Sequence, residues 1–169
     1  DLCSSFLQPW GPLVHITDFE HPITKGLPHE TSWGTNSKLA PLFYVDDTAA
    51  RVLGEVVYSQ GNCRPGFAVK EFSGWKSVYS AAPNLPAGVL RNIARYAGVH
   101  IYSDAGDVLY ANNSLLGVHA LAGGKRTFKL PARAEMVYDA FRKRPLAMNV
   151  SSFEVFLEPA STELYILSR

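Results

Sequence analysis

The chain has 169 residues and a mass of 18.6 kDa, which suits one domain or a small domain with an appended module. Its hydrophobic share is 47% and its charged share 18%, so the composition excludes disordered, collagen-like and coiled-coil classes. Lys and Arg balance Asp and Glu in both parts of the chain, with 8 against 8 in residues 1–103 and 8 against 7 in residues 104–169. We therefore expect no surface for nucleic acid or for an anionic membrane.

Hydrophobic runs in the sequence are short. Arg, Asp, Gly or Pro interrupts each of them before it reaches the roughly 18 apolar residues that a membrane-spanning helix needs, so no membrane contact is expected. The chain does not begin with Met and shows no cationic stretch followed by an apolar one. A removed leader and an origin as a piece of a longer protein both stay open, and so does the compartment.

The first hundred residues predict short strands around a long loop. Residues 18–41 contain three Pro and two Gly, which favour turns over regular structure. Runs rich in Val, Phe and Tyr, bounded by turn formers, predict the strands. The predicted strands are Leu13–Thr17, Pro41–Val45, Arg51–Tyr58, Gly66–Phe72, Lys76–Ser80 and Val99–Tyr102.

One helix is predicted over Leu85–Ala97. Apolar residues recur there at every fourth position, Pro86 suits a first helical position, and Gly98 suits a C-cap. The apolar face indicates a helix that covers a sheet, and the strand after it would complete the end of an α/β unit.

The sequence after Asp104 changes to short runs between turn signals. Spacings of about 8–12 residues without helical periodicity predict an antiparallel sheet or sandwich. The predicted strands are Val108–Ala111, Leu115–Ala120, Arg126–Leu130, Met136–Ala140, Ser152–Leu157 and Leu164–Leu167.

Several segments resemble one family. His21–Leu27 is similar to a motif of class I glutamine-amidotransferase-like domains of the trehalose-utilisation type and of the trimerisation domain of certain β-galactosidases. Gly74–Ser80 and Leu85–Val99 resemble the closing strand and helix of such domains. The remainder, with Leu130-Pro131 and Val137–Phe141, resembles the small C-terminal β domain of glycosidase-associated proteins. The resemblance covers nearly the whole chain.

The resemblance implies an α/β plus β fold. Residues 1–103 would form a partial amidotransferase-like, flavodoxin-like layer with a mostly parallel sheet, and residues 104–169 a C-terminal antiparallel β-sandwich module. The nucleophile elbow of the family would fall before Asp1, and no His and Glu pair stands around Ser80–Leu85, where the family has one. The catalytic apparatus is thus absent, and the early strands would come from excised sequence, from another chain, or not at all.

Residues suited to nucleophilic or metal chemistry have simpler interpretations. Cys63 follows Asn62 and precedes Arg64, whose charge favours a thiolate, but an ordinary loop thiol is the better interpretation; whether Cys3 and Cys63 are free stays open. No two of the five histidines have the spacing of a local metal pair, so we expect no metal and no cofactor. His21 is expected to fix its own loop by a hydrogen bond.

Paired carboxylates are the groups that glycoside hydrolysis requires. The candidate pairs are Asp18 with Glu20, Asp46 with Asp47, and Asp104 with Asp107. Each lies at a strand end or turn, where Asp is common because its side chain bonds the local backbone. The basic triplet 142–144 is interpreted as a solvated loop. These charged groups therefore predict neither a glycosidase centre nor a nucleic-acid contact.

Aromatic residues are the candidates for ligand binding. Trp33, Trp75 and Tyr79 offer apolar ring faces with polar edges, which can stack on sugar rings. Core packing is the alternative for each of them.

The expected function is that of a non-catalytic accessory or assembly module of a carbohydrate-active, β-galactosidase-like protein. The alternatives are a stand-alone sugar-binding or interaction protein, and a glycoside hydrolase fragment that contributes to a neighbouring active site. We also expect a homo-oligomer, or contact with a missing N-terminal domain, because the truncated layer would leave an open sheet edge at Leu13–Thr17 or Arg51–Tyr58.

Overall fold

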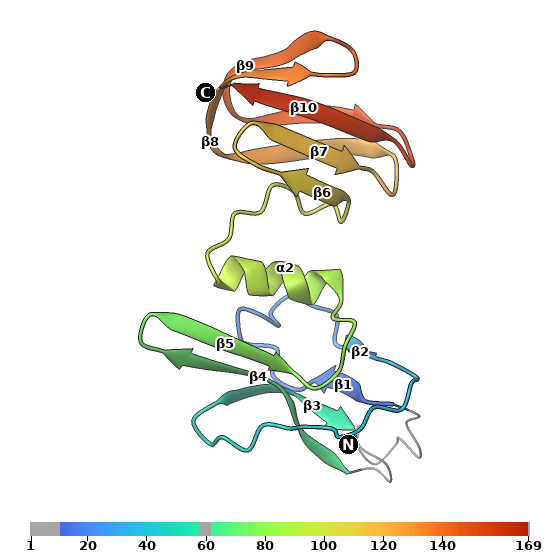
Figure 1. Ribbon diagram of the computed structural model, residues 1–169, viewed down its shortest axis with the longest axis vertical. Coiled ribbons are helices and arrows are strands. Elements are labelled where there is room, and N and C mark those ends of the chain that lie inside the picture. Colours follow the sequence, from blue (N-terminus) through green and yellow to red (C-terminus); the bar gives the residue numbers. More distant parts are fainter. Residues whose placement is uncertain (1–10, 58–61, 169) are drawn as a thin grey trace. The chain divides into compact units, whose positions relative to one another are not determined.

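The computed structural model describes residues 11–57 and 62–168. These residues form ten strands and one helix in two compact units, Asp1–Val99 and His100–Arg169, each with its own hydrophobic core (Figure 1). We call them the N-terminal unit and the C-terminal unit.

The N-terminal unit is a curled antiparallel sheet. Its elements are β1 (Leu13–Ile16), β2 (Ser32–Gly34), β3 (Arg51–Val57), β4 (Cys63–Phe72), β5 (Trp75–Ser80) and α2 (Ala87–Tyr96), and the strand order is β2-β1-β3-β4-β5. In a flat sheet the two edge strands would lie about 19 Å apart. The Trp33 indole of β2 nevertheless donates a hydrogen bond to Ser80 Oγ of β5 at 3.0 Å. The sheet therefore curls until its two edges face each other.

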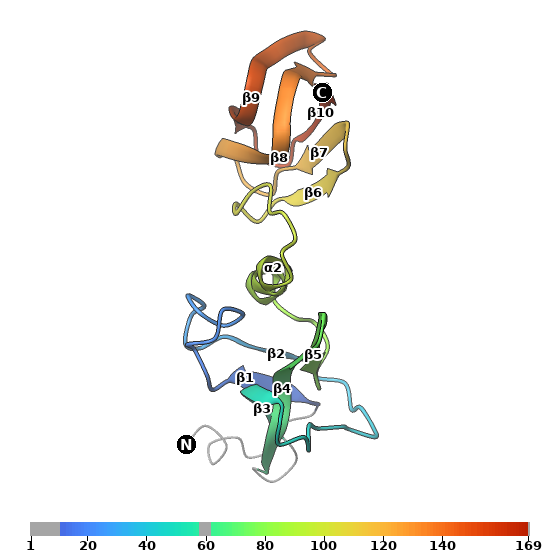
Figure 2. The same cartoon turned by 90° about the vertical axis from the view of Figure 1, so that its left-hand side faces the viewer.

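The core of this unit lies on the inner face of the curl. Val14, Val56 and Phe67 are fully buried there, and Val89 of α2 closes the open side. Figure 2 shows α2 almost end-on beside the sheet. The buried Ile23 reaches the same core from the loop between β1 and β2. Burial of this apolar face supplies the main stabilisation of the unit, at about 25 cal/mol per Å² of apolar surface removed from water.

The C-terminal end of α2 has the geometry of a Schellman motif. Gly98 adopts a φ of 77°, its N–H donates to Arg95 O at 3.0 Å, and Val99 N–H donates to Ala94 O at 2.9 Å. The predicted C-cap is confirmed. The strand predicted at Val99–Tyr102 is wrong, because these residues pair with no strand ladder and lead into the C-terminal unit.

The prediction of a flavodoxin-like α/β layer with a mostly parallel sheet is wrong. Every strand pair of the N-terminal unit is antiparallel, and the described residues contain a single helix. The physical reason lies in the connections, since parallel neighbours need a crossover of a dozen or more residues. Ser73 and Gly74 alone join β4 to β5, and Gly74 supplies the positive φ of 88° that so tight a turn requires. A connection of this length forces a hairpin.

The edges of the N-terminal sheet also differ from expectation. β1 lies between β2 and β3, and β3 lies between β1 and β4, so neither strand is an open edge. The edges are β2 and β5. The prediction of an open sheet edge at Leu13–Thr17 or Arg51–Tyr58 is therefore wrong. A proposal of association has to rest on another surface.

The segment Pro41–Val45 is not a strand. It crosses the outer face of the sheet, where Val45 N–H donates to Pro65 O at 2.9 Å and Phe43 O accepts a hydrogen bond from the Tyr79 hydroxyl at 2.8 Å. Isolated bonds of this kind anchor a loop but do not make a ladder. Its β-like composition therefore does not lead to strand pairing.

The C-terminal unit is one antiparallel sheet of order β6-β7-β10-β8-β9. Its strands are β6 (Val108–Ala111), β7 (Leu115–His119), β8 (Gly124–Asp139), β9 (Arg144–Leu157) and β10 (Thr162–Ser168). The two strands predicted within 126–140 are one long strand, and β9 begins earlier than the predicted Ser152.

This sheet folds over on itself, so a sandwich of two sheets is not what forms. Asp139 of β8 lies opposite Tyr165 of β10, and a straight strand would place Phe128 about 36 Å from Asp139. The rings of Phe128 and Tyr165 are only 6.1 Å apart. The β8–β9 hairpin therefore bends back, at an irregularity of the ladder that contains Pro131. The core lies between its halves, where Phe128 and Phe153 pack on Tyr165.

Candidate functional site

Of the three aromatic candidates, Trp33 lies in the core. Its side chain is 4% exposed, its ring packs edge-on against Phe67, and its N–H is bonded to Ser80, which donates in turn to Ala82 O at 2.7 Å. The indole thus holds the two edges of the curled sheet together, and it does not reach the surface sites described below.

Trp75 and Tyr79 lie on the outer face of the β4–β5 hairpin. Directly opposed residues of an antiparallel pair share a face. Three such pairs occupy this face: Phe72 with Trp75, Lys70 with Ser77, and Ala68 with Tyr79. The residues that alternate with them in β4, Phe67 and Val69, belong to the core. The hairpin therefore buries one face and presents aromatic and polar side chains on the other.

Phe72 and Trp75 form an exposed stacked pair at the end of the hairpin. Their ring centroids are 4.1 Å apart and the rings are parallel to within 4°. Trp75 is 58% exposed and Phe72 is 40% exposed. Phe72 covers one face of the indole, and the exposed area of Trp75 leaves room for a ligand against the ring. Two stacked rings also fix each other's orientation, which limits the entropy lost on binding.

Beside this pair lies a hollow of about 280 Å³ on the outer face of the hairpin. Phe72 and Tyr79 line it from the two strands, and Val45 and Asp47 line it from the loop before β3. The Tyr79 hydroxyl is held by its bond to Phe43 O, so its ring has a fixed position. The volume is at the lower limit of small-molecule sites and is suited to a ligand of one ring.

An ion pair supplies the charged groups of this hollow. Lys70 Nζ donates to the Asp47 carboxylate and lies 5.3 Å from the centroid of the Phe72 ring. The Lys70 ammonium and the Ala49 N–H hold the pKa of Asp47 below its ordinary value, so the carboxylate is ionised at neutral pH. A charged acceptor and a charged donor side by side can bind the two hydroxyls of a diol.

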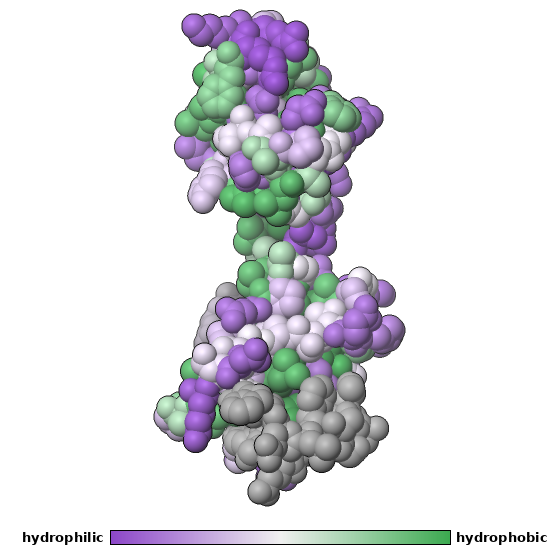
Figure 3. Space-filling view, turned by 90° about the vertical axis from the view of Figure 1, so that its right-hand side faces the viewer, coloured by the Kyte–Doolittle hydropathy of each residue, from purple (hydrophilic) through white to green (hydrophobic). Residues whose placement is uncertain are grey.

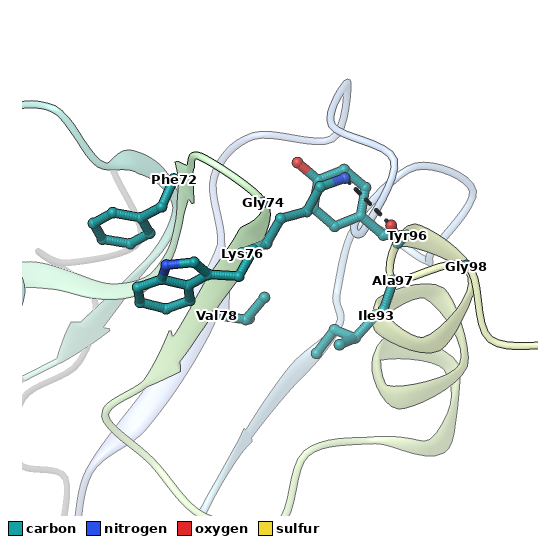
Figure 4. Close-up of a pocket in the computed structure, with 9 residues that line it drawn as sticks. Phe72, Gly74, Lys76, Val78, Ile93, Tyr96, Ala97 and Gly98 are labelled. Atoms are coloured by element: carbon teal, nitrogen blue, oxygen red, sulfur yellow. Dashed lines mark hydrogen bonds between the residues drawn. The ribbon is translucent and has the colours of Figure 1, made fainter.

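A second hollow, of about 670 Å³, lies between the hairpin and the C-terminal end of α2 (Figure 4). Val78 and Ile93 form its apolar walls. Lys76 Nζ lies 3.7 Å from the centroid of the Tyr96 ring and donates to Tyr96 O at 3.4 Å. The Tyr96 hydroxyl donates to Glu71, which raises the pKa of Tyr96. The polar groups here bond to one another, so this groove offers a ligand mainly apolar surface.

The other candidates have structural roles. Cys63 is disulfide-bonded and has no thiol for a nucleophilic attack, and Cys3 lies outside the described residues. His21 Nδ1 accepts the Ile23 N–H at 3.2 Å, which confirms that this histidine fixes its loop. His29 packs its ring on Phe19. Within residues 11–57 and 62–168, no group of three or more His, Cys, Asp or Glu side chains is arranged to hold a metal ion.

Asp18 and Asp107, one member each of two candidate carboxylate pairs, are engaged with the backbone and with arginines. Asp18 accepts from Glu20 N–H and from Arg51. Asp107 accepts two bonds from Arg126, at 2.6 and 3.2 Å. The guanidinium holds the pKa of Asp107 below its usual value; at Asp18, burial raises the pKa but these hydrogen bonds outweigh it. A general acid of a glycosidase needs the opposite shift.

Phe72, Lys70 and Asp47 are the site residues that the sequence reasoning missed. The tight Ser73-Gly74 turn was the available signal, because it sets the hairpin register and pairs Phe72 with Trp75. Nothing comparable pointed to Asp47, which reaches the hollow from a loop.

In the described part of the chain, no helix has the length and apolar content to cross a membrane.

Comparisons with known proteins give a fold likeness. No family model matches the sequence, and no curated protein matches it. A β-galactosidase from Rahnella sp. R3 has a TM-score of 0.54 and 11% identity over 92% of this chain and 21% of that chain. A β-galactosidase from Bacillus circulans sp. alkalophilus has a TM-score of 0.47 and 17% identity over 71% of this chain and 18% of that chain. This chain spans about a fifth of the length of the solved chains it resembles.

Proposed function

We propose that the chain is a non-catalytic, saccharide-binding accessory module of a carbohydrate-active, β-galactosidase-related protein. The observation that carries the proposal is the outer face of the β4–β5 hairpin, where the exposed Phe72–Trp75 pair borders a hollow with an ionised Lys70–Asp47 pair. The fold likeness to the Rahnella β-galactosidase supports the carbohydrate class, because it extends over both units of this chain.

The chemistry of this face suits a sugar. One side of a pyranose ring presents C–H groups and packs on an aromatic ring, while its hydroxyls need donors and acceptors at the rim. Trp75 supplies an exposed ring, and Phe72 and Tyr79 supply apolar walls in the hollow next to it. Lys70 and Asp47 donate to and accept from two neighbouring hydroxyls. A ligand of two linked rings would occupy the hollow with one ring and Trp75 with the other.

Three carboxylates from the candidate pairs are better suited to binding than to hydrolysis. Glycoside hydrolysis needs one carboxylic acid that stays protonated near neutral pH. The pKa values of Asp18, Asp47 and Asp107 are lowered, at Asp47 by Lys70, at Asp107 by Arg126, and at Asp18 by hydrogen bonds that outweigh its burial. Each of these groups is suited to holding a cation or a hydroxyl.

The proposal is tested by isothermal titration calorimetry with β-linked galactobiose, and with cello- and xylobiose as other disaccharides. We expect a Kd of about 1 mM or tighter for at least one of them, the affinity of a small exposed site. The Trp75→Ala variant should bind about tenfold more weakly, since an aromatic face contributes up to about 1.5 kcal/mol beyond its buried area. Asp47→Asn should weaken binding as well.

The matched control is Phe156→Ala, which removes an aromatic side chain that is 70% exposed in the C-terminal unit. It should leave the affinity unchanged. Hydrolysis of a nitrophenyl β-galactoside by the wild-type chain would contradict the non-catalytic role. Absence of binding to all three sugars, or binding that Trp75→Ala leaves intact, would contradict the site.

A glycosidase fragment that completes a neighbouring active site is the second candidate. The 21% share of the Rahnella chain favours this alternative, because a module of that size is compatible with a larger enzyme. In that case Trp75→Ala in the full-length enzyme would change kcat/KM for the substrate. If the chain is instead a separate binding module, the same variant would change only its affinity for sugar.

A further inference from the structure

The two outer layers of the C-terminal unit differ in chemistry. On the bent-back half of the β8–β9 hairpin, the outward side chains include Lys125, Thr127 and Glu154, with an ion pair of 2.7 Å between Lys125 and Glu154. This is the ordinary solvated face of an antiparallel sheet. The layer of β6, β7 and β10 is built differently.

The outer face of β6, β7 and β10 carries no Asp, Glu, Lys or Arg. The strand registers define this face, because residues that alternate with the buried Leu116, Val118 and Tyr165 must point outward. Six apolar or aromatic residues form what we call the apolar face: Val108, Tyr110, Leu115, Tyr138, Leu164 and Ile166. Gly117, His119, Thr162 and Ser168 occupy the remaining positions on these three strands.

These side chains are in contact with water. Tyr110 is 76% exposed, Val108 42%, Ile166 40% and Leu115 38%. Hydrophobic side chains reach the surface of this unit in the space-filling view (Figure 3). A monomer seldom exposes an apolar patch larger than a few hundred Å² unless the patch binds something. A sheet with apolar residues on both faces therefore indicates an interface.

We propose that a second copy of this chain docks on the apolar face, so that two C-terminal units pack face to face about a twofold axis. Such a contact is isologous, with the same residues on both sides. Residues on the axis of such a contact meet their own copies, and other residues meet different residues of the partner. Because this face holds no Asp, Glu, Lys or Arg, the contact buries no unpaired or like-paired charge from these side chains. Face-to-face packing of two antiparallel sheets at about 10 Å is a common arrangement.

The size of the apolar face sets the expected strength of the association between two copies. Four strands at about 4.8 Å and four to five residues at about 3.4 Å give a face of roughly 20 by 16 Å. Allowing for the relief of the side chains, two copies would bury about 1,000 Å² in total, at the lower limit of specific interfaces. We therefore expect a dimer that dissociates on dilution.

The proposal is tested by sedimentation velocity of the whole chain across a concentration series. The weight-average mass should rise from 18.6 kDa toward twice that value as concentration increases. Added NaCl should leave the association unchanged or strengthen it, because no charge pair across the interface is there to be screened. Tyr110→Glu and Ile166→Lys should each raise the dissociation constant at least about tenfold, since both place an unpaired charge in a dehydrated contact.

The matched control for Ile166→Lys is Phe156→Lys. It introduces the same positive charge on the outer face of the β8–β9 hairpin, beside Lys125, and should leave the dissociation constant unchanged. Far-ultraviolet circular dichroism establishes that each variant is folded. A chain that stays monomeric at the highest concentration reached, or a dimer that both charged variants leave intact, would overturn the proposal. Binding of sugar plays no part in this experiment, so its outcome is independent of the proposed function.

Discussion

Arg142 shows how a single side chain can hold the C-terminal unit together. Its guanidinium donates to Asp139 at 2.8 Å and makes two bonds of 2.8 Å to Glu163. The side chains of Asp139 and Glu163 are 1% and 8% exposed, while that of Arg142 is 49% exposed. Burial raises the pKa of Asp139, but the backbone and side-chain hydrogen bonds from Arg142 outweigh it, and the pKa lies below its ordinary value. The basic triplet is thus not merely a solvated loop.

Replacement of this arginine should destabilise the unit. In Arg142→Ala two buried carboxylates lose their partner, and we expect a loss of about 2–3 kcal/mol, below the usual cost of breaking a buried pair because water reaches the guanidinium. A lowered carboxyl pKa gives stability that is present above the unfolded pKa and is lost as pH falls through the folded one. The difference between variant and wild type should therefore shrink below about pH 4. Urea denaturation at pH 7 and pH 3 measures both effects.

The exposed Arg144 is the control for this prediction, since it follows the same turn as the first residue of β9. Arg144→Ala should change the free energy of unfolding by less than about 0.5 kcal/mol. Equal losses in the two variants would show that general charge, and not the bonds of Arg142, stabilises the turn.

At the scale of elements, β3 shows why the N-terminal sheet can curl. Its ladder with β4 shifts register on both sides of Gly54. An added Cβ at Gly54 would lie 2.4 Å from His15 O, so the β1 backbone approaches this position too closely for any side chain. A bulge increases the local twist of a strand, and twist of this kind brings the edges of the sheet together. Glycine here allows the fold that seals Trp33 in the core.

Gly54→Ala should accordingly be costly. The methyl group must displace backbone, and we expect a loss of about 1–3 kcal/mol. Fluorescence during denaturation follows this unit selectively, because all three tryptophans lie within residues 1–99. The comparison is Gly117→Ala in β7, where an added Cβ meets its nearest atom at 3.7 Å; circular dichroism follows this variant, because its unit holds no tryptophan. That variant should be neutral or slightly more stable, and a comparable loss in both would refute the argument from close approach.

At the scale of the whole molecule, the division of the chain falls slightly earlier than the sequence indicated. The C-terminal unit begins at His100 and not at Asp104. His100 Nε2 lies 2.9 Å from Lys129 O, Lys129 N–H donates to Tyr102 O at 2.8 Å, and Tyr102 packs on the core of the unit. The residues first assigned to a strand of the preceding layer thus belong to the following unit.

We expect a chain of residues 100–169 to fold by itself and to be more stable than a chain of residues 104–169. The longer piece keeps the Tyr102 ring and two hydrogen bonds, which together contribute about 2–3 kcal/mol. Thermal unfolding followed by circular dichroism at 218 nm, the usual strand band, compares the two pieces. Equal melting temperatures, or a disordered longer piece, would contradict the boundary at His100.

The sequence by itself determined the local elements. The strands at 13–17, 51–58, 66–72 and 76–80 and the strands β6, β7 and β10 were predicted near their observed places, and so was the helix with its cap at Gly98, because alternation, periodicity and capping act over a few neighbouring residues. The full lengths of β8 and β9 were not predicted. The sequence also predicted Trp75 and Tyr79 as ligand contacts, and the structure places both on one face of one hairpin. These features depend on chemistry that the chain carries locally.

The tertiary structure alone decided how those elements pair. Apart from the β4–β5 hairpin, which its short turn sets, the strand pairing of the N-terminal sheet, the curl that buries Trp33 and the bend that brings Phe128 to Tyr165 arise from contacts between residues far apart in sequence. The same holds for the site, where Asp47 meets Lys70 across a loop, and for the apolar face, which exists only when four strands are in register. The strand period of two tells which residues share a face of one strand, but the partner and the direction of each strand depend on burial summed over the whole sheet.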